Sequence, residues 1–342
     1  MAALSFFPGS NTCRGFHGFF PELMTDDEMQ RVLILKGGPG VGKSTLMKRI
    51  GAAWEKQGRD VIYYWCSGDP DSLDAVISDG RMVMDGTAPH VTDPILPGAA
   101  DGILNLGECL SDRIMAAHRS EVIALQRDMR LCYARAFRYL TGAEAALSDM
   151  QAVYQLAVDE GALINLRMET QAFLSEGAKP GRTRRAYAQA VTCKGVVQHL
   201  ESLEKGDMLC LDLPFGFDAD AVLRPLQMNL QFRGAACMAL MHPLNGKKHA
   251  HVMTDTRAVA GFVQSGQPVR TLPFNEDILR REHDALSFSR AAYNLLLHQA
   301  TSSLQQAKEK HDVLERIYAD AMDYRHLDDL QESAVEKMTE KE

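Results

Sequence analysis

The chain has 342 residues, of which 46% are hydrophobic and 24% are charged, a composition typical of a globular protein with about two domains. Its formal net charge is -8 and it has no long basic run, which argues against binding to nucleic acid through the phosphates. No apolar run approaches the roughly 20 residues that cross a bilayer, and the seven scattered cysteines form no C-x-x-C pair. We therefore expect a soluble cytoplasmic protein with no membrane or nucleic-acid partner.

The first stretch that indicates a function is a predicted apolar strand, Val32–Lys36, followed directly by a glycine-rich loop. Residues 37–45 match the pattern G-x-x-x-x-G-K-[ST], and an amphipathic stretch with helical spacing follows. Glycines let successive backbone N–H groups point at phosphates at the N-terminus of such a helix. The expected nucleotide-binding residues are Gly37, Gly38, Pro39, Gly40, Val41, Gly42, Lys43, Ser44 and Thr45.

Two side chains of this loop have separate expected roles. Lys43 is expected to reach the β- and γ-phosphates, and the Ser44 hydroxyl is expected to bind Mg²⁺. A second magnesium ligand is expected at the end of another apolar run, 81–85, which closes on Asp85 as a Walker-B strand does. Asp85 is followed by Gly86 rather than by Glu, so rapid hydrolysis is not expected.

Between these elements lies an acidic stretch with Asp69, Asp71 and Asp74, directly after a predicted strand at 61–65. Ligands of open α/β sheets bind beyond the carboxyl ends of strands, so this stretch is a possible substrate loop or metal site. An Asp-capped turn explains it equally well. His90 could contact the γ-phosphate or act as a base, and the alternative is a structural turn residue. The expected catalytic set is Lys43, Asp85 and His90.

The chain resembles itself when one half is slid along the other, which predicts an internal duplication. In one ungapped register Leu33 meets Leu209 and Val83 meets Val259. The chemical positions differ: Gly42, Lys43, Ser44 and Asp85 correspond to Asp218, Ala219, Asp220 and Gly261. The second copy therefore lacks the cation, the hydroxyl and the metal carboxylate, and one nucleotide per chain is expected.

Each α/β segment is followed by a stretch without glycine or proline, Glu108–Thr141 and Phe274–Glu342, made of strong helix formers. We expect helical hairpins or bundles there, packed on the sheets or on each other and available to a partner. The predicted division is an active α/β domain at 1–107, a helical segment and linker at 108–180, a degenerate α/β domain at 181–275 and a C-terminal helical segment at 276–342. Residues 177–185 form the junction between the halves.

Three stretches of the first half, 36–45, 66–74 and 84–90, together resemble a poorly characterised family of tandem P-loop ATPase-like proteins, found chiefly in Gram-positive bacteria. Residues 93–107 are similar to it as well. The second half resembles the family loosely. In members of the family both halves of the protein can carry an intact P-loop, whereas the second half of this chain has Asp218, Ala219 and Asp220 at the corresponding positions. The resemblance implies a P-loop NTPase fold and ATP binding, and it implies no particular substrate or pathway.

Three functions remain open. The preferred one is slow magnesium-dependent ATP hydrolysis at a single site, coupled to movement between the two halves. The second is a small-molecule or nucleotide kinase that holds its acceptor on the Asp69–Asp74 loop. The third is a non-catalytic ATP-dependent switch or scaffold that acts through the helical segments. ATP and Mg²⁺ are the expected cofactors, and the residues do not identify the second substrate or protein partner.

Overall fold

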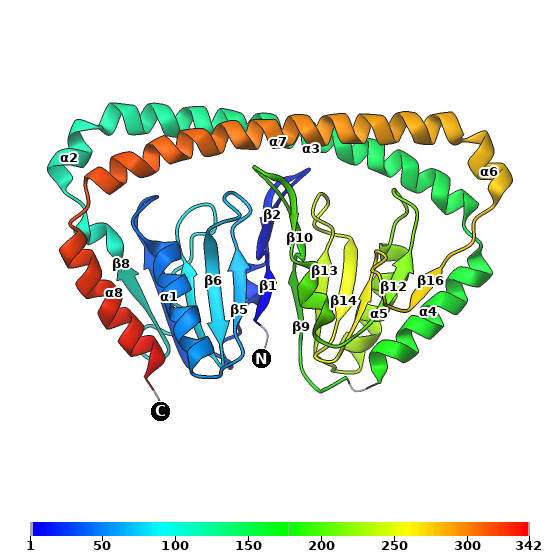
Figure 1. Cartoon of the computed structure of the whole chain (residues 1–342), viewed down its shortest axis with the longest axis horizontal. Helices are drawn as coiled ribbons and strands as arrows, with labels where there is room; N and C mark the ends of the chain where they lie inside the picture. The colour runs from blue at the N-terminus through cyan, green and yellow to red at the C-terminus, as the bar shows by residue number, and fades with distance from the viewer. Residues whose placement is uncertain (1–2, 177, 341–342) are drawn as a thin grey trace.

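Two mixed β-sheets lie side by side beneath a bridge of two long helices (Figure 1). The computed structural model describes residues 3–176 and 178–340. The prediction of a mixed α/β chain is confirmed, and the arrangement is compatible with a duplicated architecture. Gly177, which belongs to the predicted junction, and residues 1–2 and 341–342 of the predicted terminal segments lie outside the described residues.

The first sheet is six-stranded, and the loop predicted to bind phosphate follows its fifth strand in spatial order, β4. Strands β5 and β6 and strands β6 and β7 are antiparallel, whereas the other neighbours are parallel. Because β7, β4 and β8 are parallel, their carboxyl ends meet at one edge of the sheet. In spatial order the strands are β1 (Leu4–Phe6), β5 (Ile62–Trp65), β6 (Leu73–Ser78), β7 (Arg81–Asp85), β4 (Arg31–Lys36) and β8 (Asp101–Asn105).

The second sheet repeats this order and these directions strand for strand. Three of its six strands begin in the register of the predicted duplication. His249 begins a strand as its counterpart Leu73 does, and Arg257 begins the next one as Arg81 does. In spatial order the strands are β9 (Thr183–Ala186), β13 (Cys237–Met241), β14 (His249–Met253), β15 (Arg257–Ala260), β12 (Asp207–Asp212) and β16 (Val269–Thr271).

The two halves meet through a hairpin from each and through the inner faces of the sheets. The hairpins are β2–β3 (Gly9–Thr12, Gly15–Gly18) and β10–β11 (Gln189–Thr192, Gly195–Gln198), each followed by a short 3-10 helix, η1 (Phe20–Glu22) and η3 (Leu200–Lys205). One apolar cluster includes Ile34 and Met84 of the first sheet together with Cys210 and Ala260 of the second. The inner faces therefore share a continuous core, and α1 (Lys43–Lys56) and α5 (Asp220–Phe232) cover the other faces of their sheets.

The helical segments are also repeated, in a register that pairs Arg119 with His283 and Glu160 with Tyr324. After the first half come η2 (Leu106–Cys109), α2 (Asp112–Ala117), α3 (Arg119–Ala157) and α4 (Glu160–Ser175), and after the second half come α6 (Glu276–Arg281), α7 (His283–Asp320) and α8 (Tyr324–Thr339). The long helices α3 and α7 run antiparallel along each other (Figure 1). Across residues 3–176 and 178–340, no helix combines the length and the apolar character that crossing a bilayer requires.

The short helices at the ends of the bridge are exchanged between the halves. Helix α4, which follows the first half in sequence, packs on α5, and α8 packs on α1 (Figure 1). At about 1.5 Å per residue, the 39 residues of α3 carry the chain about 58 Å, across to the other sheet. The segments therefore differ from the expected hairpin after each half: their long helices pair with each other because Leu140, Leu147 and Leu304 contribute to one shared apolar cluster.

Candidate functional site

The glycine-rich loop between β4 and α1 has a backbone that requires glycine. Gly42 precedes α1 with a φ of 87°, in the left-handed region that side chains other than glycine rarely adopt. No side chain of the described residues caps this end of α1. The first N–H groups of a helix have no partner within the helix and carry a partial positive charge, so this end can accept an anion.

The side chain of Lys43 folds back onto the first residues of the loop. Its Nζ atom donates hydrogen bonds to the carbonyl oxygens of Gly37 at 2.9 Å and Gly38 at 2.7 Å. It also lies 3.6 Å from Asp85 Oδ2, and its side chain is only 10% exposed. Burial lowers the pKa of Lys43, and the nearby Asp85 carboxylate opposes that shift. A cation is thus held opposite a carboxylate at the edge where the parallel strands end.

Asp85 is oriented by its neighbour Thr87. The Asp85 Oδ1 atom accepts hydrogen bonds from the Thr87 backbone N–H at 2.8 Å and from the Thr87 hydroxyl at 2.6 Å, while Oδ2 faces Lys43. The Ser44 hydroxyl oxygen accepts a hydrogen bond from Leu73 N at 3.0 Å. A hydroxyl oxygen has two lone pairs, so this bond leaves one for a metal. Hydroxyl and carboxylate oxygens are the donors that suit Mg²⁺.

A buried carboxyl and a buried imidazole complete the cluster. Asp74 lies on β6 and is buried; burial and the Asp85 carboxylate raise the pKa of Asp74 to about 7. His90 Nε2 lies 3.9 Å from Asp74 Oδ1, and its ring stacks on Phe20 with 4.3 Å between centroids. Burial lowers the pKa of His90, so the ring is kept neutral. A carboxyl that titrates near neutral pH can exchange a proton with a reacting group.

The acidic stretch 69–74 does not act as one set of ligands. Asp69 accepts a hydrogen bond from the Ser72 hydroxyl and lies 3.4 Å from Lys308 of α7. Asp71 is exposed and pairs with Lys194 of the second half. Asp74 alone belongs to the Lys43 cluster. The three aspartates are close together in the chain and were predicted as one loop, whereas Asp74 points inward from strand β6 and the other two lie outside the cluster.

Residues of α7 and α8 contact the loop, and sequence reasoning missed them. A Cβ atom on Gly38 would lie 2.1 Å from Tyr318 Cε1 on α7. Gln331 of α8 donates to the Gly42 carbonyl oxygen at 3.4 Å and accepts from Arg49 at 3.0 Å. The Glu315 carboxylate, like that of Asp85, opposes the lowering of the Lys43 pKa by burial. No motif marks these residues, because only the length of α7 and the exchange of α8 bring them to the first half.

Glu315 also belongs to a small group of potential metal ligands beside the loop. The ligand atoms of His311, Asp312 and Glu315, all on α7, lie within 4.8 Å of one another. Lys308, one turn earlier on α7, pairs with Asp312 and supplies a competing cation. The lysine already occupies one of the carboxylates that a metal would need, and no metal site is assigned here.

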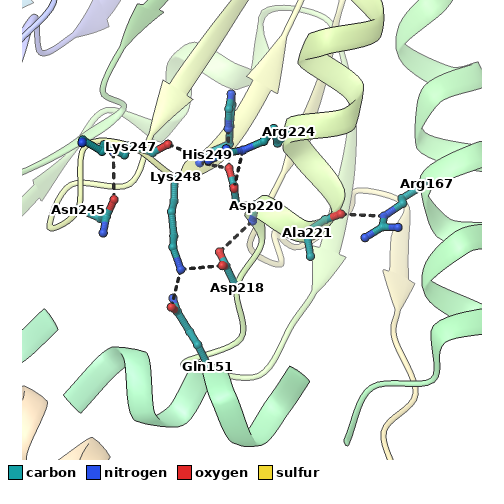
Figure 2. A network of polar contacts seen from close by, with 10 residues as sticks. All are labelled: Gln151, Arg167, Asp218, Asp220, Ala221, Arg224, Asn245, Lys247, Lys248 and His249. Carbon is teal, nitrogen blue, oxygen red and sulfur yellow. Dashed lines mark hydrogen bonds and ion pairs between the residues drawn. The ribbon is translucent and has the colours of Figure 1, made fainter. Parts of the chain in front are cut away.

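Figure 2 shows the corresponding region of the second half, where charged side chains pair with one another. Asp218, at the position equivalent to Gly42, lies 2.7 Å from Lys248 Nζ, which also donates to Gln151 at 2.6 Å. Asp220, at the position equivalent to Ser44, contacts His249 Nδ1 at 2.6 Å and Arg224 at 2.8 Å. Burial opposes the charged form of Asp220, but the bonds from His249 outweigh it and lower the pKa of Asp220.

One backbone contact is common to both halves although the side chains differ. In the first half Leu73 N donates to Ser44, and in the second half His249 N donates to Asp220 Oδ1 at 2.8 Å. The two pairs are equivalent in the register of the predicted duplication. The second half thus keeps the framework around the loop, and it replaces the lysine with Ala219 and fills the region with internal ion pairs.

A model of the family described as Nephrocystin 3, N-terminal, matches residues 16–78. The matched region runs from β3 to the last residue of β6, so it includes the glycine-rich loop and α1 and stops before Asp85 and His90. It covers a minority of the chain and none of the second half. No curated protein and no solved structure matches the chain. The similarity therefore concerns the strand–loop–helix unit of the first half.

Proposed function

We propose that the chain binds one magnesium–ATP at residues 37–45 and hydrolyses it slowly, and that α7 and α8 carry the resulting change towards the second half. The observation that carries this proposal is the position of Lys43, whose ammonium group lies on the loop carbonyls and 3.6 Å from Asp85. The phosphates would replace the carbonyls as its partners. The P-loop pattern and the resemblance to tandem P-loop ATPase-like proteins support the same assignment.

The roles of the surrounding residues follow from their chemistry. The N–H groups of the loop and of the first turn of α1 would bind the phosphate oxygens. Ser44 and Asp85 would hold Mg²⁺, which would offset the negative charge of the phosphates. Asp74, with a pKa of about 7, is the group that could take a proton from the attacking water. Turnover should be slow because Gly86, rather than a second carboxylate, follows Asp85.

Coupling to the second half is supported by the contacts of the bridge. Tyr318 and Gln331 contact the loop, and they lie on helices that are continuous with, or adjoin, the long antiparallel pair. A loop that rearranges around phosphates would have to move these side chains. Since α3 and α7 pack along each other, a displacement at one end would reach the other sheet.

The test compares two lysine variants on the same helix. Lys43→Ala should lose the thermal stabilisation by magnesium–ATP, which reaches about 2.7 kcal/mol at 100 times the dissociation constant. Lys56→Ala, an exposed position in the last turn of α1, should keep it. Phosphate release measured in parallel should be slow in the wild type and in the control, and absent in Lys43→Ala. Equal thermal shifts in all three proteins would remove the nucleotide assignment.

A non-catalytic switch is the second candidate, favoured by the contacts of Tyr318 and Gln331 with the loop, which would report binding without hydrolysis. Nucleotide-dependent stabilisation without phosphate release would favour it over the ATPase. The kinase alternative receives less support, because Asp69 and Asp71 are turned towards Lys308 and Lys194 rather than towards Lys43.

A further inference from the structure

The inner face of the first sheet carries a cavity of about 530 Å³, on the side opposite to α1. Its apolar wall is formed by side chains from the sheet and from the segment after η1: Met24, Met29, Val32, Ile34, Met82 and Met84. The volume falls in the range of small-molecule sites, about 300–1,000 Å³. Methionines are flexible and polarizable, so such a wall can adapt to an aromatic or aliphatic ligand.

One polar group in this apolar surrounding is incompletely bonded. Asp101 is 5% exposed and lines the cavity. Its Oδ2 atom accepts hydrogen bonds from the backbone N–H groups of Ile95 at 2.6 Å and Leu96 at 3.1 Å. Its Oδ1 atom is buried and accepts no hydrogen bond from any of the described residues. A buried acceptor without a partner is costly, so a ligand that donates to it would gain the missing bond.

The charged side chains around the cavity indicate whether a ligand that donates a hydrogen bond to Asp101 would be cationic or neutral. Four of its lining residues are aspartates and one is an arginine: Asp26, Asp27, Asp93, Asp101 and Arg182. Arg182 comes from the second half and pairs with Asp27 at 2.8 Å. Lys36 pairs with Asp93 at 3.1 Å, so the four carboxylates face two cations. The remaining excess of carboxylates favours a cationic ligand and opposes an anionic one. We propose that this cavity binds a small amphipathic amine, with its apolar body against the methionines and its ammonium group on Asp101.

The wall of this cavity is not repeated residue for residue in the second half. The strand positions that correspond to Met82 and Met84 are Ala258 and Ala260, which carry a single methyl group in place of a methionine side chain. The connection after β7 spans residues 86–100, whereas the one after β15 spans only 261–268. The longer connection supplies Val91 and Ile95, exposed by 66% and 60%, at the edge of the cavity. The cavity is thus a feature of the half that carries Lys43.

The cavity also adjoins the Lys43 cluster, although the proposed amine binding does not depend on a nucleotide. Phe20 lines the cavity and stacks on His90. Lys36, the last residue of β4, donates to the carbonyl oxygens of Gly86 at 2.9 Å and Thr92 at 2.7 Å, and Thr92 lines the cavity. An occupant would therefore contact the segment that directly follows Asp85.

Three probes of similar shape test the charge preference: tryptamine, neutral 3-ethylindole and anionic indole-3-propionate. Methyl-¹³C methionine NMR of the full chain follows them, with the cavity methionines assigned by single Met→Leu variants. Tryptamine should shift these methyl signals saturably, at least about tenfold more tightly than 3-ethylindole, a difference of about 1.4 kcal/mol. Indole-3-propionate should leave them unshifted. Unshifted signals with tryptamine, or equal affinities for the amine and the neutral probe, would overturn the proposal.

Two substitutions locate the ammonium group. Asp101→Asn keeps the shape and removes the charge, and it should weaken tryptamine about tenfold and leave 3-ethylindole unchanged. Val91→Lys adds a cation at an exposed position, so it avoids a risk to folding and should also weaken tryptamine. Val263→Lys, at a 50% exposed valine of the second half, is its matched control and should bind like the wild type. Equal tryptamine affinities for the two lysine variants would contradict the site.

Discussion

Phe7 and Tyr187 pair with each other across the boundary between the two halves. Phe7 N donates to the Tyr187 carbonyl oxygen at 2.8 Å, and Tyr187 N donates to the Phe7 carbonyl oxygen at 2.9 Å. The two positions are also equivalent to each other, since each lies just before the first strand of its hairpin, which begins at Gly9 in one half and at Gln189 in the other. A residue paired with its own counterpart lies on the approximate two-fold axis of the molecule, so the two halves face each other as the subunits of a symmetric dimer would.

Substitution of Asp85, the proposed metal ligand, should separate turnover from nucleotide binding. Asp85→Asn should reduce magnesium-dependent phosphate release by more than about tenfold, because a neutral amide is a poor ligand for a hard cation. Nucleotide affinity should change less, since the loop N–H groups and Lys43 remain. Asp112→Asn, at an exposed position in the first turn of α2, serves as the control. Phosphate release by Asp85→Asn at the wild-type rate would move the metal carboxylate to Asp74.

Calorimetric titration with a slowly hydrolysed ATP analogue should give a stoichiometry near one per chain. In the second half Asp218 and Asp220 bring negative charge to the place of the phosphates and are held there by Lys248, His249 and Arg224. Unit charges about 4 Å apart interact by roughly 4 kcal/mol at an effective dielectric constant near 20. Ala219→Lys alone should therefore not create a second site. A stoichiometry near two in the wild type would show that the second half binds nucleotide after all.

The contact between the loop and α7 can be tested by a double-mutant cycle. In Gly38→Ala the new methyl group would lie 2.1 Å from Tyr318 Cε1, so the tyrosine ring or the loop has to shift. Overpacking of this kind should lower the free energy of unfolding by about 1–3 kcal/mol. Adding Tyr318→Ala removes the obstructing ring and should make the loop substitution nearly neutral. Additive effects of the two substitutions in thermal unfolding would mean that the loop and α7 are not in contact.

Asp74 should make stability fall as the pH rises from about 4 to about 7. The pKa of its carboxyl is about 7 in the folded protein and has an ordinary value of 3.8. Below both values the group is protonated in the folded and unfolded states, and its contribution is fully present. Between them the unfolded chain is ionised and the folded chain is not, so stability is lost as pH rises through this window, at about 1.4 kcal/mol per pH unit.

Denaturation of Asp74→Asn over that pH range, without nucleotide, checks this effect. The variant is uncharged at every pH and should show a flatter curve than the wild type. Asp112→Asn should follow the wild type, because its carboxylate is exposed in the first turn of α2. Parallel curves for wild type and Asp74→Asn would mean that this carboxyl is ionised in the folded protein.

The features that the sequence by itself determined are those that depend on neighbouring residues or on a periodic pattern. The apolar run before Gly37, the glycine spacing and the position of Lys43 specify a strand, a tight loop and a helix, because each depends on neighbouring residues and on the permitted backbone angles of glycine. The repeat could be read for the same reason: β4, β6 and β7 and their counterparts β12, β14 and β15 begin in one register, although the loop residues Asp218 and Ala219 differ in chemistry from Gly42 and Lys43.

Only the tertiary structure decided which distant residues complete the site. Gln331 and Gly42 are 289 positions apart, and they meet because α3 and α7 are long enough to exchange α4 and α8 between the halves. The sequence pattern places Asp74 in an acidic loop. In the structure it lies on β6 and is buried, and burial raises the pKa of its carboxyl. Such contacts and burial depend on helix length and on the packing of two sheets, quantities that no stretch of neighbouring residues encodes.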